Sequence, residues 1–109
     1  MKALIIKKEW LDKIFFENKT WEMRSRITKI RGRIQLIESG SGLIVGECFL
    51  VDSFKVPSGD FNKHIDKHKV ENTNLLDKWN CAWVLKNAIK YEKPIKYNHP
   101  KGAVIWVNL

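Results

Sequence analysis

The chain has 109 residues, enough for one ordinary domain, which we expect to cover residues 1–109. Its hydrophobic fraction of 44% and charged fraction of 29% are typical of a globular protein and exclude a disordered chain. The apolar runs are too short for a membrane-spanning helix or a signal peptide, so we expect a cytoplasmic protein with no membrane segment. The formal net charge of +8 favours an anionic partner such as a nucleic acid.

The first quarter of the chain predicts a strand, a helix and a second strand. Apolar residues 3–6 predict the first strand, and the spacing of apolar side chains over residues 10–16 predicts an amphipathic helix. Asn18 can close this helix, because asparagine tolerates the left-handed backbone common just past a helix end. The alternating pattern over residues 20–26 predicts the second strand.

The rest of the chain predicts a hairpin, short helices and closing strands. We expect a strand around residues 34–36 and a long strand over 43–54 interrupted at Gly46. A short helix after Pro57 would carry Phe61, Ile65 and His68, and a second short helix would cover residues 73–79. Strands are expected over residues 81–85 and 103–109. Ser58 or Asp60 could cap the first of these helices. The elements predict a mainly β fold with peripheral helices (α+β), a small mixed β-barrel with one helix after its first strand.

The expected core is made of apolar side chains from these elements. Its members are Leu4, Ile6, Leu11, Ile14, Phe15, Ile34, Leu36, Val45, Phe49, Val51, Trp83, Leu85, Ile105 and Val107. Cys48 and Cys81 lie far apart without a partner at metal-ligand spacing, so we expect reduced, packed thiols and no zinc. His64 and His68 would share a helix face, either as solvated or capping side chains or as a catalytic base; with no third ligand evident, we expect no metal and no cofactor.

Positive charge is concentrated between residues 19 and 33. This segment holds six lysines and arginines, against Glu22 as its only acid. The cations are Lys19, Arg24, Arg26, Lys29, Arg31 and Arg33. The planar arginine fork suits phosphate recognition, and Trp21 within the segment could stack on an unpaired base, which favours RNA binding. The alternative is a solvated basic edge that keeps strands from aggregating.

Residues 18–24, Asn-Lys-Thr-Trp-Glu-Met-Arg, are the most distinctive local feature of the chain. As a strand, they place Thr20, Glu22 and Arg24 on one face, with Lys19 at the entrance. A carboxylate between two cations is stabilised as an anion, so Glu22 would be a poor general acid and suits binding better. The alternative is a surface ion pair of little energetic value.

The chain resembles the ASCH domain family, a group with a PUA-like β-barrel fold. Residues 18–24 are similar to the family pattern G-x-K-T-x-E-x-R, with Asn18 where the family often has glycine. The other similar segments, in family order, are residues 3–7, 10–14, 31–34, 42–48, 82–85, 94–95 and 102–106. The resemblance implies a cleft between the barrel and the first helix, lined at positions 19, 22 and 24, and RNA or nucleotide binding.

We therefore predict an RNA- or modified-nucleoside-binding module with a basic cleft. Its predicted ligand contacts are Lys19, Thr20, Trp21, Glu22, Arg24, Arg26, Arg31 and Arg33. A third possibility, a protein-interaction domain with an acidic partner, stays open.

A hydrolase acting on RNA or a modified nucleoside is the alternative function, with Lys19 and Glu22 as its catalytic residues. Some family members resemble amidohydrolases that deacetylate acetylcytidine with a K-T-x-T-x-R motif and a downstream glutamate, and others resemble ribonucleases. Here Glu22 replaces the nucleophilic threonine of that motif, and a carboxylate would form an anhydride on accepting an acyl group. Glu71 is the nearest candidate for the downstream acid.

Overall fold

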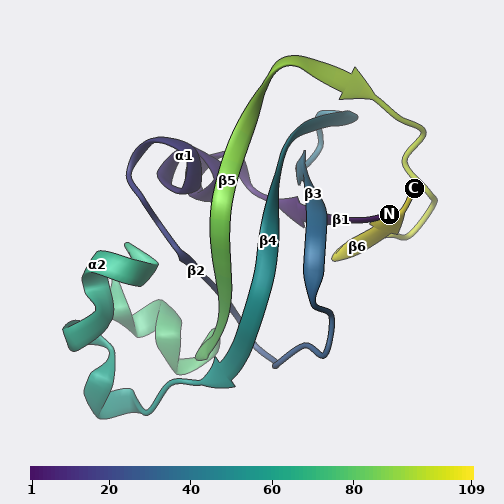
Figure 1. The fold of residues 1–109 in the computed structure, drawn as a ribbon. Coiled ribbons are helices and arrows are strands. Elements are labelled where there is room, and N and C mark those ends of the chain that lie inside the picture. The colour runs from purple at the N-terminus through teal and green to yellow at the C-terminus, as the bar shows by residue number, and fades with distance from the viewer.

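A computed structural model describes all residues from 1 to 109, and six strands in it form one mixed sheet (Figure 1). The strands are β1 (Lys2–Ile6), β2 (Trp21–Arg24), β3 (Gly32–Glu38), β4 (Leu43–Lys55), β5 (Cys81–Lys96) and β6 (Trp106–Asn108), in the spatial order β2-β5-β4-β3-β1-β6. The helical elements are α1 (Lys8–Phe16), α2 (Ile65–His68) and the 3-10 turns η1 (Ser58–Asp60), η2 (Asn62–His64) and η3 (Thr73–Asp77). The predicted class, mainly β with peripheral helices, is confirmed.

β1, α1 and β2 follow one another in sequence, but β1 and β2 do not pair in the sheet, because β5, β4 and β3 lie between them. β1 pairs in parallel with β3, and every other strand pair is antiparallel. α1 ends at Phe16, and Asn18 follows with a φ of 57°, the left-handed turn that the sequence predicted. The N–H of Lys19 then donates to the carbonyl of Lys13 at 3.0 Å, which closes the turn and directs the chain into β2.

The sheet curves without closing into a hydrogen-bonded barrel. β2 and β6 are its two edges and share no backbone hydrogen bond. Side chains bridge the gap: the rings of Trp83 and Trp106 stack with centroids 5.7 Å apart, and Arg24 of β2 donates to the carbonyl of Ile5 in β1 at 2.9 Å. The molecule is therefore an open barrel whose seam is joined by aromatic and guanidinium groups.

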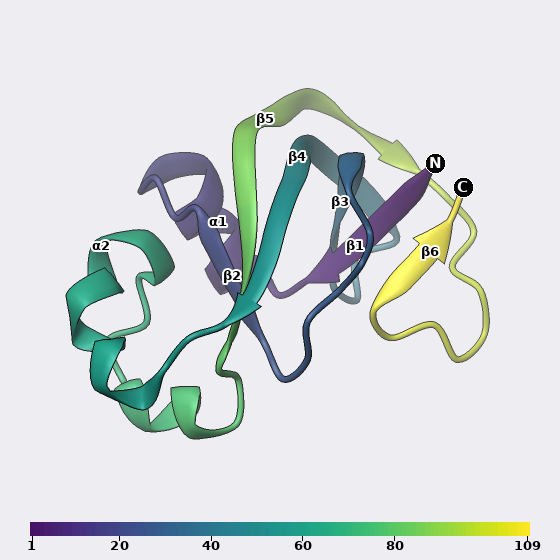
Figure 2. The same ribbon diagram turned by 60° about the horizontal axis from the view of Figure 1, so that its bottom comes forward.

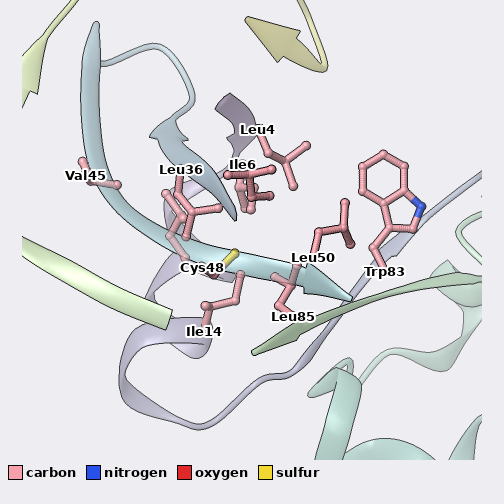
Figure 3. Packing of buried hydrophobic residues seen from close by; sticks show 11 residues of the cluster. Leu4, Ile6, Ile14, Leu36, Val45, Cys48, Leu50, Trp83 and Leu85 are labelled. Carbon is pink, nitrogen blue, oxygen red and sulfur yellow. The ribbon is translucent and has the colours of Figure 1, made fainter. Parts of the chain in front are cut away.

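Both faces of β1 are buried, which explains its uninterrupted apolar sequence. Leu4 and Ile6 pack in the main core with Leu11 and Ile14 of α1, as Figure 3 shows for part of this cluster. Ala3 and Ile5 point the other way, into a second cluster. Its other members are Ile37, Ile44 and Val107, with Tyr91, Tyr97 and Ala103 against them. Tyr91 belongs to the second half of β5, and Tyr97 follows the end of that strand.

A third cluster joins the helical region to β2. It contains Trp21, Met23, Val56, Phe61, Val70, Leu76 and Ala82. His68 is fully buried beside it: Nδ1 accepts from the N–H of Val70 at 2.9 Å, so Nε2 carries the proton to the carbonyl of Phe61 at 2.7 Å. Burial lowers the pKa of His68, in keeping with a neutral imidazole. This histidine is therefore a buried structural side chain, and the solvated alternative is wrong.

Three residues predicted to lie in the core are exposed instead. Phe49 is 40% exposed, Val51 41% and Ile105 46%. The burial pattern of β4 explains the first two, since they alternate with Cys48 and Leu50, which are fully buried, and alternate side chains point to opposite faces. Ile105 lies in the connection before β6, where its carbonyl accepts from the N–H of Ile5.

Strand boundaries also differ from prediction. β5 continues to Lys96, beyond the predicted end at residue 85, and includes Pro94. Gly46 does not interrupt β4; the register shifts next to it, and a Cβ there would lie 2.6 Å from the Phe15 ring. The same Cβ would lie 2.5 Å from the carbonyl oxygen of Ile89 in β5, so only glycine fits where β4, β5 and Phe15 of α1 meet.

The helical region is less regular than predicted. Residues 58–64 form 3-10 turns, and α2 is one turn long. Neither Ser58 nor Asp60 caps a helix: the capping position of η1 is Pro57, and Asp60 pairs with Lys63 at 3.1 Å. Cys48 and Cys81 are buried free thiols, and burial raises the pKa of Cys48 to about 12. α1, with nine residues, is the longest helix, and none could span a membrane.

The two ends of the chain lie side by side. Figure 2 shows both termini beside β1 and β6, on the opposite side of the molecule from α2. The terminal ammonium of Met1 donates to the carbonyl of Leu109 at 3.1 Å, and Lys2 donates to the Asn108 side chain at 2.8 Å.

Candidate functional site

A pocket of about 360 Å³ lies where the start of α1, β2 and the segment after α2 meet. Its buried walls come from Ile5, Lys19, Glu22, Met23, Val70 and Leu76, its half-buried walls from Trp10, Arg24 and Leu75, and its exposed rim from Lys7, Glu9, Ser39, Trp79 and Val104. The three motif positions 19, 22 and 24 thus converge on one concavity. Mostly apolar walls with a few convergent polar groups are characteristic of small-molecule sites.

Lys19 is held in the pocket by backbone carbonyls. Its side chain is buried, and Nζ donates to the carbonyl of Trp21 at 2.7 Å and to the carbonyl of His68. The same ammonium lies 5.0 Å from the centre of the Trp10 ring. Burial lowers the pKa of Lys19 to about 8, although the nearby Glu22 carboxylate partly opposes this by favouring the charged form. The ammonium therefore titrates close to neutral pH.

Glu22 and Arg24 lie on the same face of β2, as the alternating pattern predicted. Glu22 Oε2 accepts from Arg24 Nε at 3.1 Å and from Nη2 at 2.9 Å, while Oε1 lies 3.8 Å from Lys19 Nζ. Arg24 Nη2 also donates to the carbonyl of Ile5, and its guanidinium lies 5.4 Å from the centre of the Trp83 ring. Glu22 is thus a buried carboxylate held between two cations.

The charges that line the pocket nearly cancel. Lys7, Lys19 and Arg24 supply three positive charges when ionised, and Glu9 and Glu22 supply two negative ones. The three buried or half-buried groups satisfy one another, so the free charges are at the rim. This arrangement favours a polar, nearly neutral ring inside the pocket over a bare phosphate.

Thr20 and Trp21 of the motif do not line the pocket. The Thr20 backbone joins α2 and β5, accepting from Leu85 and donating to Lys67. Trp21 is only 6% exposed and packs edge-on against Phe54, with ring centroids 5.2 Å apart. The predicted base-stacking role does not fit a ring this deeply buried. Trp10 and Trp79 are the tryptophans that reach the pocket.

Arg26, Arg31 and Arg33 also lie outside the pocket. Arg33 forms a bidentate pair with Glu47, with nitrogen–oxygen distances of 2.8 and 2.9 Å, and Arg31 donates to backbone carbonyls of its own loop. Arg26 is exposed, and its carbonyl accepts from Trp83 Nε1. The dispersal follows from the sheet order: β2 and β3 are consecutive in sequence, but β5 and β4 lie between them.

Several residues that line the pocket were not predicted from the sequence as site residues. Glu9 and Trp10 belong to the first turn of α1, and their place beside the motif lysine could have been inferred from the expected cleft. Trp79 and Val104 come from the irregular connections on either side of β5, where no pattern indicates direction. The downstream candidate Glu71 is exposed and does not line the pocket. The structure contains no cluster of three or more metal-ligating side chains.

Comparisons with known proteins identify the family and the fold of this chain. The family model of the ASCH domain matches residues 4–95. The crystal structure of an ASCH protein from Zymomonas mobilis is 15% identical, with a TM-score of 0.74 over 99% of this chain and 86% of that chain. One variant of that protein has a TM-score of 0.70 at 16% identity, over 87% of this chain and 74% of that chain. A second variant has a TM-score of 0.74 at 15% identity, over 99% of this chain and 87% of that chain. No match was found among the curated proteins. Identities this low establish a common fold only.

Proposed function

Because this chain belongs to the ASCH domain family, a PUA-like family linked to RNA binding, we propose that it binds RNA or a modified nucleoside in the pocket beside α1. The observation that carries the proposal is the convergence of Lys19, Glu22 and Arg24 on this pocket. The binding site is narrower than the basic segment, because Arg26, Arg31 and Arg33 line no part of it.

Unused hydrogen-bonding groups in the pocket suit the edge of a base. Glu22 Oε1 accepts no hydrogen bond within the protein, and Arg24 Nη1 donates none. Together they offer an acceptor for an amino or ring N–H and donors for a ring carbonyl, the complement of groups on unpaired bases. Lys19 is already bonded to two carbonyls, so its role is to hold β2 against α2 and to supply charge beside Glu22.

The aromatic walls suit the faces of the same ring. Trp10 is half-buried and Trp79 is 40% exposed, and both line the pocket. Bases stack readily on tryptophan, with on the order of 1–3 kcal/mol lost per base on alanine substitution. A planar polar ring can thereby satisfy the polar groups of the pocket and cover its apolar walls.

Calorimetric titration with nucleosides, N4-acetylcytidine and short single-stranded RNA tests the proposal. Glu22→Gln and Arg24→Gln each remove one charged hydrogen-bonding group, worth roughly 1.5–3 kcal/mol, so affinity should fall about tenfold or more. Arg33→Gln is the matched control, because it breaks a bidentate pair outside the pocket and should change affinity less than about twofold. Absence of binding to all these compounds, or an equal loss in the Arg33 variant, would overturn the proposal.

A hydrolase is the second candidate function. It is favoured by Lys19, whose pKa is lowered and which lies beside Glu22 in the pocket, because titratable groups with shifted pKa values cluster at active sites. With glutamate in place of the threonine, a water molecule would be the nucleophile. Glu22 would take its proton as the water oxygen bonds to the acyl carbon, and would return it to the amine as the carbon–nitrogen bond breaks. Lys19, when protonated, would offer its third N–H to the oxyanion, because the other two are bonded to the carbonyls of Trp21 and His68.

Turnover assays with acetylcytidine and with RNA separate this candidate from simple binding. Activity of the purified protein should disappear in both Lys19→Ala and Glu22→Gln and persist in Arg33→Gln. Equal rates in wild type and the two pocket variants would identify a contaminating enzyme and reject catalysis by this site.

A further inference from the structure

We propose that the pocket receives one nucleotide of a single-stranded RNA, with Lys7 at the rim and Lys78 beside the rim residue Trp79 holding the phosphates on either side, so that a strand binds more tightly than a free nucleoside. This inference rests on the proposed function and specifies its ligand. It depends on three features of the molecule: the pairing of charges inside the pocket, two unpaired lysines at its edge, and one exposed tryptophan beside the second of them.

The interior of the pocket offers no free cation for a phosphate. Lys19 Nζ is bonded to two carbonyls and lies beside Glu22, and Arg24 uses two of its nitrogens on the same carboxylate. A phosphate placed here would lie next to a buried carboxylate and would lose its hydration without gaining an unpaired cation. The anionic part of a nucleic acid must therefore remain at the rim.

Lys7 is placed to meet one such phosphate. It is exposed, lines the pocket between β1 and α1, and its ammonium takes part in no ion pair or hydrogen bond. The next residue, Lys8, is by contrast paired with Asp12 at 2.8 Å and does not line the pocket. The charge of Lys7 is therefore available to a ligand phosphate, whereas that of Lys8 is paired within the protein.

Lys78 and Trp79 form a second contact point on a different segment, between η3 and β5. Trp79 lines the pocket, and Lys78 Nζ lies 5.4 Å from the centre of its ring. Lys78 is exposed and makes no ion pair. Proteins that hold single strands combine an aromatic platform for a base with cations along the backbone, and this pair places the two together.

Glu9 is the one carboxylate on the rim, and it has no ion-pair partner. It would repel a phosphate near Lys7. The proposal therefore predicts that Glu9→Gln raises the affinity for an RNA strand.

The test compares a fluorescently labelled pentaribonucleotide with the corresponding nucleoside, over a range of salt concentrations. The wild type should bind the pentamer more tightly, with an affinity that falls as salt rises. Each phosphate contact on a single strand contributes roughly 0.7 to the slope of log affinity against log salt, so Lys7→Gln/Lys78→Gln should lower the slope by about 1.4. That variant should also lose more affinity for the pentamer than for the nucleoside.

A second double variant, Lys8→Gln/Lys93→Gln, removes the same charge from lysines outside the pocket and should keep the wild-type slope. Equal slopes in the two double variants would overturn the proposal, as would a pentamer that binds no more tightly than the nucleoside. Nucleoside binding without a strand preference removes this inference and leaves the proposed function intact. Failure of both ligands to bind removes both.

Discussion

The charged groups of the pocket and Arg33 on the outer face of β3 come from one basic segment but serve different purposes. Glu22 is 4% exposed and Lys19 2%, and both are held by fixed partners inside the pocket. Arg33 is exposed and pairs with Glu47 across two strands in contact with water. Charge density along the sequence therefore does not describe a surface, because strands that follow one another in sequence can lie far apart in the sheet.

The largest expected difference between the two regions concerns Arg24. Its removal leaves Glu22 as a buried carboxylate whose nearest cation is 3.8 Å away, so Arg24→Gln should lower the free energy of unfolding by about 3 kcal/mol. Urea denaturation measures this. The double variant Glu22→Gln/Arg24→Gln should recover part of the loss, because the buried carboxylate is gone, while Lys19 keeps its two carbonyl acceptors but loses its carboxylate neighbour. A double variant less stable than Arg24→Gln would contradict this account.

The pH dependence of stability should reveal Lys19. The pKa of its ammonium is about 8 in the folded protein and about 10.5 when unfolded. Below pH 8 the group is charged in both states, and the full cost of burying it is present. Between pH 8 and 10.5 the unfolded chain holds more protons, so this contribution to stability rises with pH, by on the order of 3 kcal/mol in total.

Comparison with Lys19→Met isolates the contribution of Lys19 to stability. The Cys48 thiol, whose pKa is raised to about 12, lowers stability as pH rises, but it is present in both proteins and cancels in the difference. The difference between the unfolding free energies of wild type and variant should grow from pH 8 to pH 10. A constant difference would mean that Lys19 keeps an ordinary pKa.

At pH 7 the same variant, Lys19→Met, should be less stable than the wild type by about 2 kcal/mol. The carbonyls of Trp21 and His68 lose their donor, and this outweighs the relief of removing a buried charge. Thermal unfolding followed by circular dichroism measures the change. A variant as stable as the wild type would show that the two carbonyl bonds contribute nothing net.

The smallest effect is expected on the outer face. Arg33→Gln breaks an exposed pair with Glu47 and should cost less than about 1 kcal/mol, falling further in high salt. Urea denaturation at low and high salt measures it. A loss as large as that of Arg24→Gln would show that exposure is not what separates the two regions.

Local patterns predicted much of the site. The period of two in residues 20–26 placed Glu22 and Arg24 on one face of β2, and the spacing of apolar residues placed α1 before it. The resemblance to the ASCH domain supplied the expectation of a cleft beside that helix, where the structure has its pocket. The burial of Trp21 was missed, because its neighbours Phe54 and His64 come from distant parts of the chain.

The sequence by itself determined the β-rich class, the first helix and the excess of positive charge, since composition and short-range periodicity carry that information, and the resemblance of residues 18–24 to a family pattern indicated the ASCH domain. Tertiary structure alone decided which charges became available. Pairing β2 with β5 moved Arg31 and Arg33 away from the pocket, and packing against α2 buried Lys19. The connections on either side of β5 brought Trp79 and Val104 to its rim. These outcomes depend on contacts between segments distant in sequence, for which no local pattern exists.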